Sequence, residues 1–463
     1  MPPTQELRVF LDELERDHPE QVLRIAEPVN PVYDATAVVF EAERQPACPV
    51  VRFEQVGSSP FPLVVNVLST KGRLARGLGV DEAALPAAFG ERVARLVEPR
   101  RCADAAFEAN VLEGDALDLG LLPALTHFEQ DGGPYITAGH VVARDPYSGI
   151  ETIGYHRIMV KGPRRLGISL HSRRRMYEYH RRAEEAGRPL EVAVVLGVPP
   201  AVSLGSIAFP PADAGKFGII GSLLGEPLEV ARCRTVDLDV PRWAEIIIEG
   251  HILAGEREKE GPFGEFTGYA STRGTENVLI PTAIQYRDRA IYQSHNAGLS
   301  LEHCMFLALP REVMVTQVLR RTIPNLKAVR VPIRSGCGSF HVYVSIRKTA
   351  EGQAKQAIMA VLGADHYFKH VIVVDDDVDV FDDEEVMWAV ATRMQADRDL
   401  VVASGGMSTL LDPSSPDGSG AKLGIDATRP LGPFADRLTL PESAVARARA
   451  LIGAAPAQVS GLA

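Results

Sequence analysis

The middle of the chain differs from both ends in the spacing of its apolar residues. Residues 111–300 contain short β-type runs, among them AGHVVARD, ETIGYHRIMV, LEVAVVLG and AEIIIEGHI, separated by glycine and proline. Such spacing predicts a barrel or a strongly bent sheet. Residues 1–110 and 301–463 alternate helical patterns with apolar runs, which predicts α/β units, and the order after residue 301 predicts a parallel or mixed sheet. The sequence therefore predicts a mixed α/β and β protein with three domains.

Composition limits the partners of such a chain. Its 463 residues, 46% hydrophobic and 24% charged, suit a globular protein of two or three domains. The formal net charge of −11 argues against nucleic acid or an anionic membrane as the main partner, because both need a basic face. The five cysteines form no CxxC pair, the N-terminus carries acids in an amphipathic helical pattern, and no apolar run approaches membrane-spanning length. We therefore expect a cytoplasmic protein.

An acidic segment imitates a calcium loop. Asp375, Asp377 and Asp379 in VVDDDVDVFDDEEV have the spacing of the first calcium ligands, but valines stand where an EF-hand needs glycine and glutamate. A strand end followed by a helix N-cap at Asp382 is the better interpretation.

Two segments could hold an anion. The basic run 171–175, HSRRR, is either an anion site at a helix N-terminus or a solvated helix face. The loop with Gly418, Gly420 and Lys422 could hold a phosphate, although it lacks the Walker pattern.

One arginine and two glutamates carry the clearest chemical signal. Arg157 lies in IGYHRIM, and Glu260 and Glu265 lie in the glycine- and proline-containing run EKEGPFGEFTGY. A buried carboxylate without a partner is costly, which favours function over packing. If the Arg157 guanidinium forms a bidentate ion pair with Glu260, Glu265 is left free to exchange a proton near a bound anion. The alternative is a surface ion pair beside a solvated loop acid.

The order of several motifs favours the chemical interpretation. From about residue 135 to 430 the chain contains GYHRIMV, LHS, GVPPAVSLGSIAF, EVARC, VPRWAEIIIEGHI, EGPFGEFTGY, VIVVDDDVDV, WAVATRM and GSGAKLGIDAT. In these stretches it resembles the UbiD family of reversible decarboxylases, which use prenylated FMN and include ferulic acid decarboxylase and 3-octaprenyl-4-hydroxybenzoate decarboxylase. The resemblance implies a central split β-barrel that binds the cofactor, flanking α/β segments, and a C-terminal α/β domain that dimerises.

The resemblance also implies roles for single residues. Arg157 would bind the substrate carboxylate, Glu260 would orient the arginine, and Glu265 would carry the proton. Prenylated FMN would hold the electrons that carbon dioxide leaves behind, because no side chain can hold them. Aromatic residues of the same run would keep the site dry, namely Phe263, Phe266 and Tyr269. The expected cofactor-binding residues are Thr152, Arg157, His171, Arg173, Ser206, Ile207, Lys216 and Lys422.

One departure from the family pattern concerns a metal. The family usually holds a divalent metal at the cofactor phosphate with Asn, His and Glu, and those places fall here on Thr152, His171 and Lys216. Only the histidine remains, and a protonated lysine cannot ligate Mn²⁺ or Mg²⁺. We therefore expect a metal-independent variant in which Lys216, with His171, Lys422 and Arg173, neutralises the phosphate.

The expected function is reversible, non-oxidative decarboxylation of an α,β-unsaturated or (hetero)aromatic carboxylic acid. A flavin prenyltransferase would supply the cofactor, and the assembly would be a homodimer or higher homo-oligomer. The alternatives are a catalytically degenerate UbiD-like subunit or flavin-binding scaffold, and a flavin oxidoreductase. In the segment 294–306, either His295, Asn296 and His303 bind a polar group of the substrate or the histidines are satisfied at a helix N-terminus.

Overall fold

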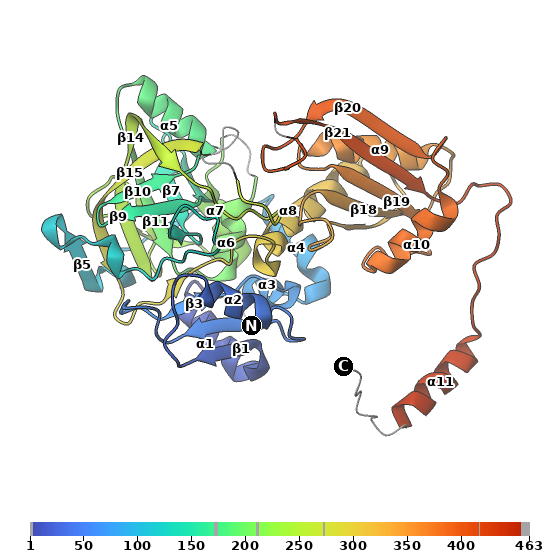
Figure 1. Cartoon of the computed structure of the whole chain (residues 1–463), viewed down its shortest axis with the longest axis horizontal. Helices are drawn as coiled ribbons and strands as arrows, with labels where there is room; N and C mark the ends of the chain where they lie inside the picture. Colours follow the sequence, from blue (N-terminus) through green and yellow to red (C-terminus); the bar gives the residue numbers. More distant parts are fainter. Residues whose placement is uncertain (1–2, 171–174, 210–212, 272–273, 416, 455–463) are drawn as a thin grey trace.

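A computed structural model describes residues 3–170, 175–209, 213–271, 274–415 and 417–454, and it confirms a mixed α/β protein with a curled central sheet. Figure 1 shows the N-terminal helices and strands packed against the central sheet, the C-terminal unit beside them, and the last helix apart from the body. Within the described ranges, no helix is long and apolar enough to cross a membrane.

The N-terminal unit is a small sheet covered by helices. Its strands are β1 (Val22–Ile25), β2 (Val50–Phe53) and β3 (Leu63–Val65), and its helices are α1 (Leu7–Asp17), α2 (Asp34–Ala42), α3 (Lys71–Leu78) and α4 (Leu85–Arg92). The apolar residues of α1 recur at helical spacing and are buried, which explains how the helix docks. β16 (Tyr292–Gln293) pairs in parallel with β3, so a strand from much later in the chain completes this sheet.

The central unit is built on a nine-stranded sheet with the order β6-β9-β10-β15-β14-β11-β7-β8, in which β5 pairs with β15. Every strand pair recorded in this sheet is antiparallel, as expected where short loops connect successive strands. β14 and β15 are the longest strands, and they pair with each other in the middle of the sheet. The strands are β5 (Asn110–Glu113), β6 (Tyr135–Ile136), β7 (His140–Arg144), β8 (Glu151–Tyr155), β9 (Ile158–Gly162), β10 (Arg165–Ile168), β11 (Leu190–Leu196), β14 (Ile246–Glu260) and β15 (Gly274–Tyr286).

Three helices and a small sheet flank the central sheet. The helices are α5 (Arg175–Glu185), α6 (Pro200–Ile207) and α7 (Lys216–Leu224), and the small sheet contains β4 (Arg100–Arg101), β12 (Glu229–Arg232) and β13 (Asp239–Pro241). All residues of α6 are buried, and it packs against α7 and β8. This packing brings the end of α6 and the start of α7 to β8.

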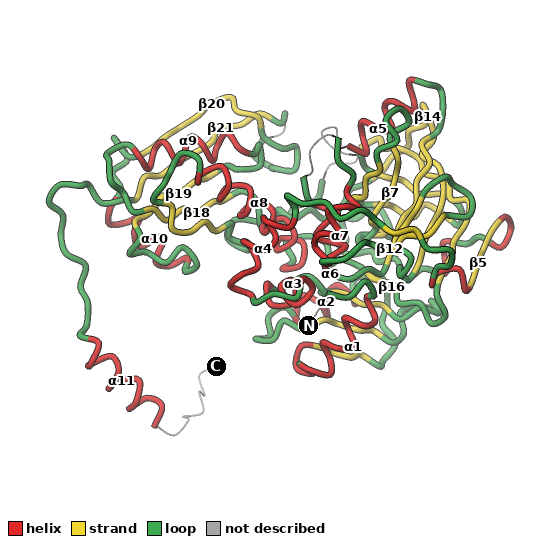
Figure 2. The backbone as a smooth tube through the Cα atoms, turned by 180° about the vertical axis from the view of Figure 1, so that it is seen from behind, coloured by secondary structure: helices red, strands yellow, loops and turns green. Residues whose placement is uncertain are grey.

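The long helix α8 (Leu301–Arg320) leads from the central unit into the C-terminal unit (Figure 2). There, a mixed five-stranded sheet has the order β17-β18-β19-β21-β20, and β18, β19 and β21 run parallel, as the alternating pattern predicted. The strands are β17 (Leu326–Arg330), β18 (His341–Ile346), β19 (His370–Asp375), β20 (Leu400–Met407) and β21 (Ser419–Ala427). The helices are α9 (Gln353–Ala364), α10 (Asp383–Arg393) and α11 (Glu442–Ala454).

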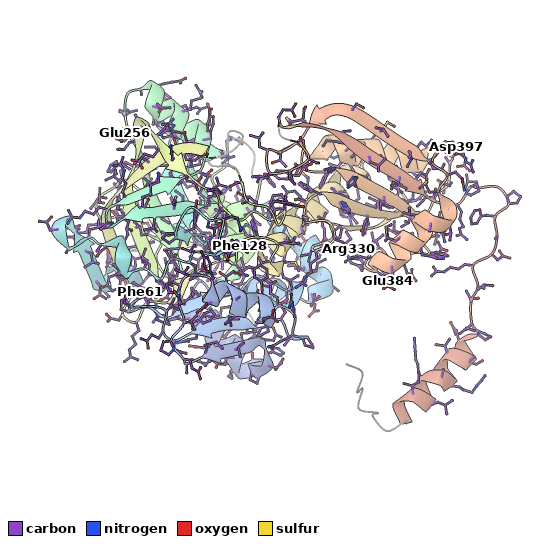
Figure 3. The ribbon with its side chains drawn as sticks, viewed as in Figure 1. Phe61, Phe128, Glu256, Arg330, Glu384 and Asp397 are labelled. Carbon is purple, nitrogen blue, oxygen red and sulfur yellow. The ribbon has the colours of Figure 1, made fainter. Side chains whose placement is uncertain are left out.

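The acidic segment after β19 has a structural role. Asp382 caps α10, where its carboxylate accepts hydrogen bonds from the backbone N–H groups of Glu384 and Glu385, as predicted. Arg393 pairs with Asp375 at 2.6 Å and with Asp377 at 2.9 Å. Two of the three aspartates with calcium-like spacing are therefore engaged in ion pairs. Figure 3 places the neighbouring side chains of Arg330 and Glu384 on this unit, far from Glu256 of β14.

Candidate active site

Arg157, Glu260 and Glu265 meet at one edge of the central sheet. Arg157 lies in the short turn between β8 and β9, Glu260 is the last residue of β14, and Glu265 follows in the loop toward β15. The guanidinium of Arg157 donates from Nε to Glu260 Oε1 (3.1 Å) and from Nη2 to Oε2 (2.8 Å), which is the predicted two-pronged pairing. Its Nη1 donates to the carboxylate of Glu265 and, at 3.2 Å, to Ser271 Oγ.

This geometry corrects one expectation. Glu265 is not left free when Arg157 pairs with Glu260, because one guanidinium has enough donors for both carboxylates. Burial raises the pKa of Glu265, and the charge of Arg157 only partly offsets that effect. Burial disfavours the charge of Arg157, but the two glutamates raise its pKa above the ordinary value. Arg157 therefore stays charged, and Glu265 takes up a proton more readily than an ordinary glutamate does.

The loop that carries Glu265 is held by close packing and by hydrogen bonds. Asp131 accepts a hydrogen bond from the backbone N–H of Gly264 (2.9 Å). Phe128, near the middle of the molecule in Figure 3, lies against this loop, and a Cβ atom on Gly264 would come within 2.3 Å of its ring. Any larger residue at position 264 would therefore push the loop away. Glycine at this point lets the loop that carries Glu265 pack directly against the Phe128 ring.

The aromatic residues expected to exclude water divide into two groups. Phe263 and Phe266 are buried, and the Arg157 guanidinium lies 5.6 Å from the centroid of the Phe263 ring. Tyr135 adds to this cluster, with its ring centroid 4.6 Å from that of Phe263. Tyr269, in contrast, is 63% exposed, so the expectation that it keeps the site dry was wrong. The reason is local: the turn at residues 265–269 directs that side chain outward.

Arg157 and Glu265 open onto a pocket, whereas Glu260 lies fully buried behind them. The pocket encloses about 1050 Å³ of empty space, including its open mouth. It lies between the central sheet, the N-terminal half of α8 and the edge of the C-terminal unit. Its aromatic and aliphatic wall includes Tyr155, Ile207, Phe263, Phe266, Phe306 and Tyr367, and its polar wall includes Thr137, His156, His295, Asn296, His303 and Arg311.

Several of the predicted cofactor residues lie together at the junction of β8, α6 and α7. Lys216, the first residue of α7, donates from Nζ to the backbone carbonyl of Ser206, and Ile207 lines the pocket. A Cβ atom on Gly154 would lie 4.0 Å from Lys216 Nζ, which places the ammonium beside β8. Thr152 is buried two residues earlier on the same strand. His171 and Arg173 lie outside the described residues.

Lys422 lies elsewhere. It is on β21, and its Nζ donates to the backbone carbonyls of Leu362 (3.4 Å), Asp365 (3.2 Å) and His366 (3.2 Å). It is not part of the pocket surface that the described residues form, and it supports the segment after α9 that brings Tyr367 to the pocket. The structure therefore separates Lys422 from the Lys216 group.

The residues of segment 294–306 lie where the sequence placed them, on the pocket wall. Burial lowers the pKa of His295 to about 3 and that of His303 to about 4, so both rings are neutral at neutral pH. His303 Nδ1 bonds the carbonyl oxygen of Gly298 at 3.2 Å, which agrees with the interpretation of a satisfied histidine. His295 Nε2 finds no hydrogen-bond partner among the described residues, whereas the side chain of Asn296 faces the buried ring of His127. The interpretation of a satisfied histidine therefore fits His303, and binding of a polar substrate group by His295 and Asn296 stays a prediction.

Sequence reasoning missed Tyr155 and Arg311 as pocket residues. Tyr155 could have been predicted from the sequence, because it precedes Arg157 by two positions in the same strand-turn motif and shares its side of the chain. Arg311 carried only a weak signal: with Glu312 it forms a charged pair of neighbours in the middle of a mostly apolar helix. Its Nε donates to Asp365 (3.1 Å), Nη1 donates to the carbonyl of Leu307 (2.9 Å), and the guanidinium lies 4.6 Å from the Tyr367 ring centroid. Its partners Asp365 and Tyr367 come from the C-terminal unit, which the sequence could not place relative to α8.

The residues present do not fit a divalent metal. Within the described part of the chain, no group of three or more His, Cys, Asp or Glu side chains could hold one. At the two expected ligand places that the structure describes stand Thr152, a neutral hydroxyl, and Lys216, an ammonium. Hard divalent cations need several carboxylate, carbonyl or water oxygens, which this pair does not provide.

The fold and the site define a decarboxylase of the carboxy-lyase class. Residues 11–93, 100–299 and 304–427 match the N-terminal, Rift-related and C-terminal domains of 3-octaprenyl-4-hydroxybenzoate carboxy-lyase, UbiD. The chain belongs to the UbiD family.

Individual relatives cover nearly the whole chain. Anhydromevalonate phosphate decarboxylase of Methanothermobacter thermautotrophicus is 35% identical over 429 residues, which are 92% of this chain and 97% of the relative. The solved structure of the UbiD-class enzyme HmfF from Pelotomaculum thermopropionicum in complex with FMN is 37% identical with a TM-score of 0.89, covering 94% of this chain and 97% of that one. An evolved dimeric form of HmfF in complex with prFMN is 35% identical with a TM-score of 0.87, covering 95% and 97%.

Proposed function

We propose that this protein catalyses the reversible, non-oxidative decarboxylation of an α,β-unsaturated or (hetero)aromatic carboxylic acid with prenylated FMN as its cofactor. The observation that carries the proposal is a half-buried arginine held by one carboxylate behind the pocket and one carboxylate inside it. Two of these three groups face the pocket, so they can act on a bound acid. The FMN and prFMN complexes of HmfF support the choice of cofactor.

Arg157 binds the substrate carboxylate in this proposal, and Glu260 holds the guanidinium in place. A substrate carboxylate that takes the position at Nη1 displaces the carboxylate of Glu265 from its cation. Glu265 then loses the charge that opposes the effect of burial, so its pKa rises further and it takes up a proton. After carbon dioxide leaves, Glu265 delivers that proton to the same carbon atom.

The pocket has the features that a flavin needs. When bound, prenylated FMN supplies the electron sink for decarboxylation at an sp² carbon. Ile207, Tyr155 and Phe306 offer apolar and aromatic surface for a planar ring, and the amide of Asn296 on the pocket wall offers polar atoms to its edge. Lys216, at the N-terminus of α7, places an ammonium and a helix dipole where a phosphate would be stabilised.

Lys216 takes the place of the metal in this proposal. Purified active protein should contain no stoichiometric Mn²⁺ or Mg²⁺, and activity should survive a chelator. Lys216→Ala should weaken FMN retention by at least tenfold, while Lys161→Ala, a lysine of β9 that is ion-paired at 2.9 Å with Glu258, should leave it unchanged. Stoichiometric metal in the active protein would contradict the proposal.

Arg311 indicates a second charged group on the substrate. It is a second buried cation in the same pocket, and it lies on α8 rather than on the central sheet. The relative named as an anhydromevalonate phosphate decarboxylase acts, by that name, on a compound with a phosphate group. We therefore infer that the substrate carries a second anionic group in addition to the carboxylate that leaves.

The decisive experiment is to produce the protein together with a flavin prenyltransferase, its inferred cofactor supplier, and to measure carbon dioxide release from a panel of acids. The panel should contain unsaturated aliphatic and aromatic acids, each with and without a second anionic group. Glu265→Gln should abolish release, while Glu258→Gln, an acid of β14 outside the pocket, should not. Loaded protein that releases nothing from any acid would favour the alternative of a flavin-binding scaffold.

We also infer a cytoplasmic homodimer. The cysteines within the described residues are all free, which fits a reducing compartment. α11 has no buried residue among those described, and Leu451 and Ile452 are 73% and 76% exposed. A solvated helix of this length is marginal on its own, so a second subunit is a natural partner for it.

A further inference from the structure

The loop that carries Glu265 rests on a second loop, residues 127–133, which stands far earlier in the sequence. Gly132 donates from its backbone N–H to the carbonyl oxygen of Pro262 at 2.8 Å. A Cβ atom on Gly132 would come within 2.4 Å of the carbonyl oxygen of Gly261, so a larger residue would force the two backbones apart. The two loops therefore meet directly through their main chains.

The side chain of Asp131 joins these two loops. Its Oδ1 accepts a hydrogen bond from the backbone N–H of Gly264 (2.9 Å), which lies on the loop of Glu265. Its Oδ2 accepts from the N–H groups of His127 (2.9 Å) and Phe128 (3.0 Å) on its own loop. Gly264 directly precedes Glu265, so one half-buried carboxylate fixes the backbone next to the expected proton carrier.

A carboxylate suits this place better than an amide of the same size. All three backbone groups that bond its oxygens are donors, and an ionised carboxylate only accepts. An asparagine has one oxygen, so its NH₂ group would turn toward at least one N–H donor. Burial raises the pKa of Asp131, but the three N–H groups and the charge of Arg157 oppose that rise. The surroundings of Asp131 therefore favour an acceptor on both sides of the side chain.

Gly264 is held from further directions as well. The ring of Phe128, labelled in Figure 3, would lie 2.3 Å from a Cβ atom at position 264 and 2.6 Å from one at position 298. Gly298 donates from its backbone N–H to the carbonyl oxygen of Gly264 at 3.1 Å. Both backbone polar groups of Gly264 are thus bonded to other segments, and an aromatic ring packs against its Cα. The loop has little room to move at this residue.

We propose that Asp131 is a positioning residue for Glu265: by tying the loop of Glu265 to residues 127–131, its carboxylate places that side chain for delivery of the proton. The inference rests on the proposed function. Proton transfer needs the donor within hydrogen-bond reach of the accepting carbon, so a small shift of the loop slows it. Arg157 does not depend on this tie, because Glu260, the last residue of β14, holds its guanidinium from behind. Binding of the substrate carboxylate and delivery of the proton should therefore respond differently to loss of Asp131.

Two substitutions test the tie from its two ends. Asp131→Asn keeps the size of the side chain and removes one acceptor, and Gly264→Ala leaves Asp131 intact but pushes the loop away from Phe128. Asp118→Asn is the matched control, because Asp118 accepts a hydrogen bond from the backbone N–H of Gly120 (2.7 Å) outside the pocket. FMN affinity is measured by fluorescence titration. Values of kcat and KM are measured on cofactor-loaded protein, in H₂O and in D₂O, with the best substrate of the acid panel.

The expected result is a loss of turnover without a loss of binding. Asp131→Asn and Gly264→Ala should each lower kcat at least tenfold while KM and FMN affinity stay within twofold. The ratio of kcat in H₂O to kcat in D₂O should rise in both variants, because delivery of the proton then limits the rate. Asp118→Asn should change none of these quantities. Unchanged kcat in Asp131→Asn, or a loss of FMN affinity as large as the loss of kcat, would overturn the proposal.

Amide hydrogen exchange tests the tie without any catalytic activity. Mass spectrometry of protein saturated with FMN compares the unchanged chain with Asp131→Asn. We expect faster exchange in segments 127–132 and 261–266, whose N–H groups lose their acceptor, and unchanged exchange in the paired part of β14 at residues 246–252. Unchanged exchange in segment 261–266 would overturn the proposal even in a protein that decarboxylates well. Faster exchange there in a protein that decarboxylates no acid would support the tie and count against the proposed function.

Discussion

Arg157 and Arg311 both line one pocket, and they differ in the number of carboxylates that face them. Arg157, on the central sheet, faces two carboxylates, Glu260 and Glu265. Arg311, on α8, faces the single carboxylate of Asp365. Burial raises the pKa of Glu265. It acts in the same direction on Asp365, but there His366, Arg311 and the N–H of Tyr367 prevail and lower the pKa to about 2.

The difference indicates which arginine can exchange its partner. At Arg157 the acids outnumber the cation, so one carboxylate can be protonated or displaced without leaving the arginine unpaired. At Arg311 the charges balance one to one, and removing Asp365 would leave a buried cation alone. The first arrangement suits proton transfer coupled to the binding of an anion. The second suits a permanent positive charge that selects among substrates.

Substitution of each arginine by lysine should separate these roles most strongly. Arg157→Lys keeps the charge but loses the bidentate ion pair with Glu260. We therefore expect kcat/KM for decarboxylation to fall at least a hundredfold, with kcat strongly reduced. Arg311→Lys should raise KM for an acid with a second anionic group by about tenfold and leave kcat within a few fold. Steady-state kinetics on cofactor-loaded protein measures both.

The exposed Arg165→Lys, in an ion pair with Glu258 at the surface, is the control for both variants. If Arg311→Lys lowered kcat as strongly as Arg157→Lys, Arg311 would take part in the reaction itself rather than in the selection of substrates.

The pH dependence should follow Glu265 and not Asp365. The folded-state pKa of Glu265 lies above its ordinary value, so the protonated form persists to a higher pH than in a free glutamate. Substrate binding requires this proton, so kcat/KM should decrease as pH rises through the raised pKa, approaching tenfold per pH unit. Asp365 stays ionised down to pH of about 2 and adds no transition between pH 5 and 8.

Calorimetry gives an independent measure of that proton. Titration of a non-reacting acid in buffers of different ionisation enthalpy should detect about one proton taken up per acid bound, and none in Glu265→Gln. Equal proton uptake by Glu265→Gln and by the unchanged protein would assign the proton to another group.

Asp365 should contribute to stability in the opposite direction to Glu265. Its pKa falls from 3.8 to about 2 on folding, and its side chain is 12% exposed. The shift corresponds to about 2 kcal/mol of stability that is present above pH 4 and is lost as pH falls toward the folded pKa. Asp365→Asn should therefore lower the free energy of unfolding by about 2 kcal/mol at pH 7, as measured by urea denaturation. An equal loss for the exposed Asp397→Asn would show that the effect is not local to Arg311.

The contrast between the arginines also marks what the sequence could reveal. Arg157 stands 103 residues before Glu260, and their pairing was predictable because both lie in motifs that resemble those of one family. Arg311 and Asp365 are 54 residues apart and meet only because α9 packs on α8. The same limit applies to Lys422, whose glycine-rich surroundings suggested a phosphate loop, while long-range packing directs it to three carbonyl groups behind the pocket wall. A contact between distant segments was therefore predictable where both partners stand in recognisable motifs, but not where packing alone brings them together.

The smallest effect on catalysis should come from removing α11. Every group of the proposed site that the structure describes, including both arginines and their acids, lies between residues 137 and 411 of one chain, far from this helix (Figure 1). Truncation before Glu442 removes a helix with no buried residue among those described, so folding and kcat should stay within twofold. Light scattering should detect a shift from dimer to monomer, because a solvated helix of this length needs a partner. A truncated protein that remains dimeric would place the subunit contact on the C-terminal sheet instead, where Val402 of the edge strand β20 is 64% exposed.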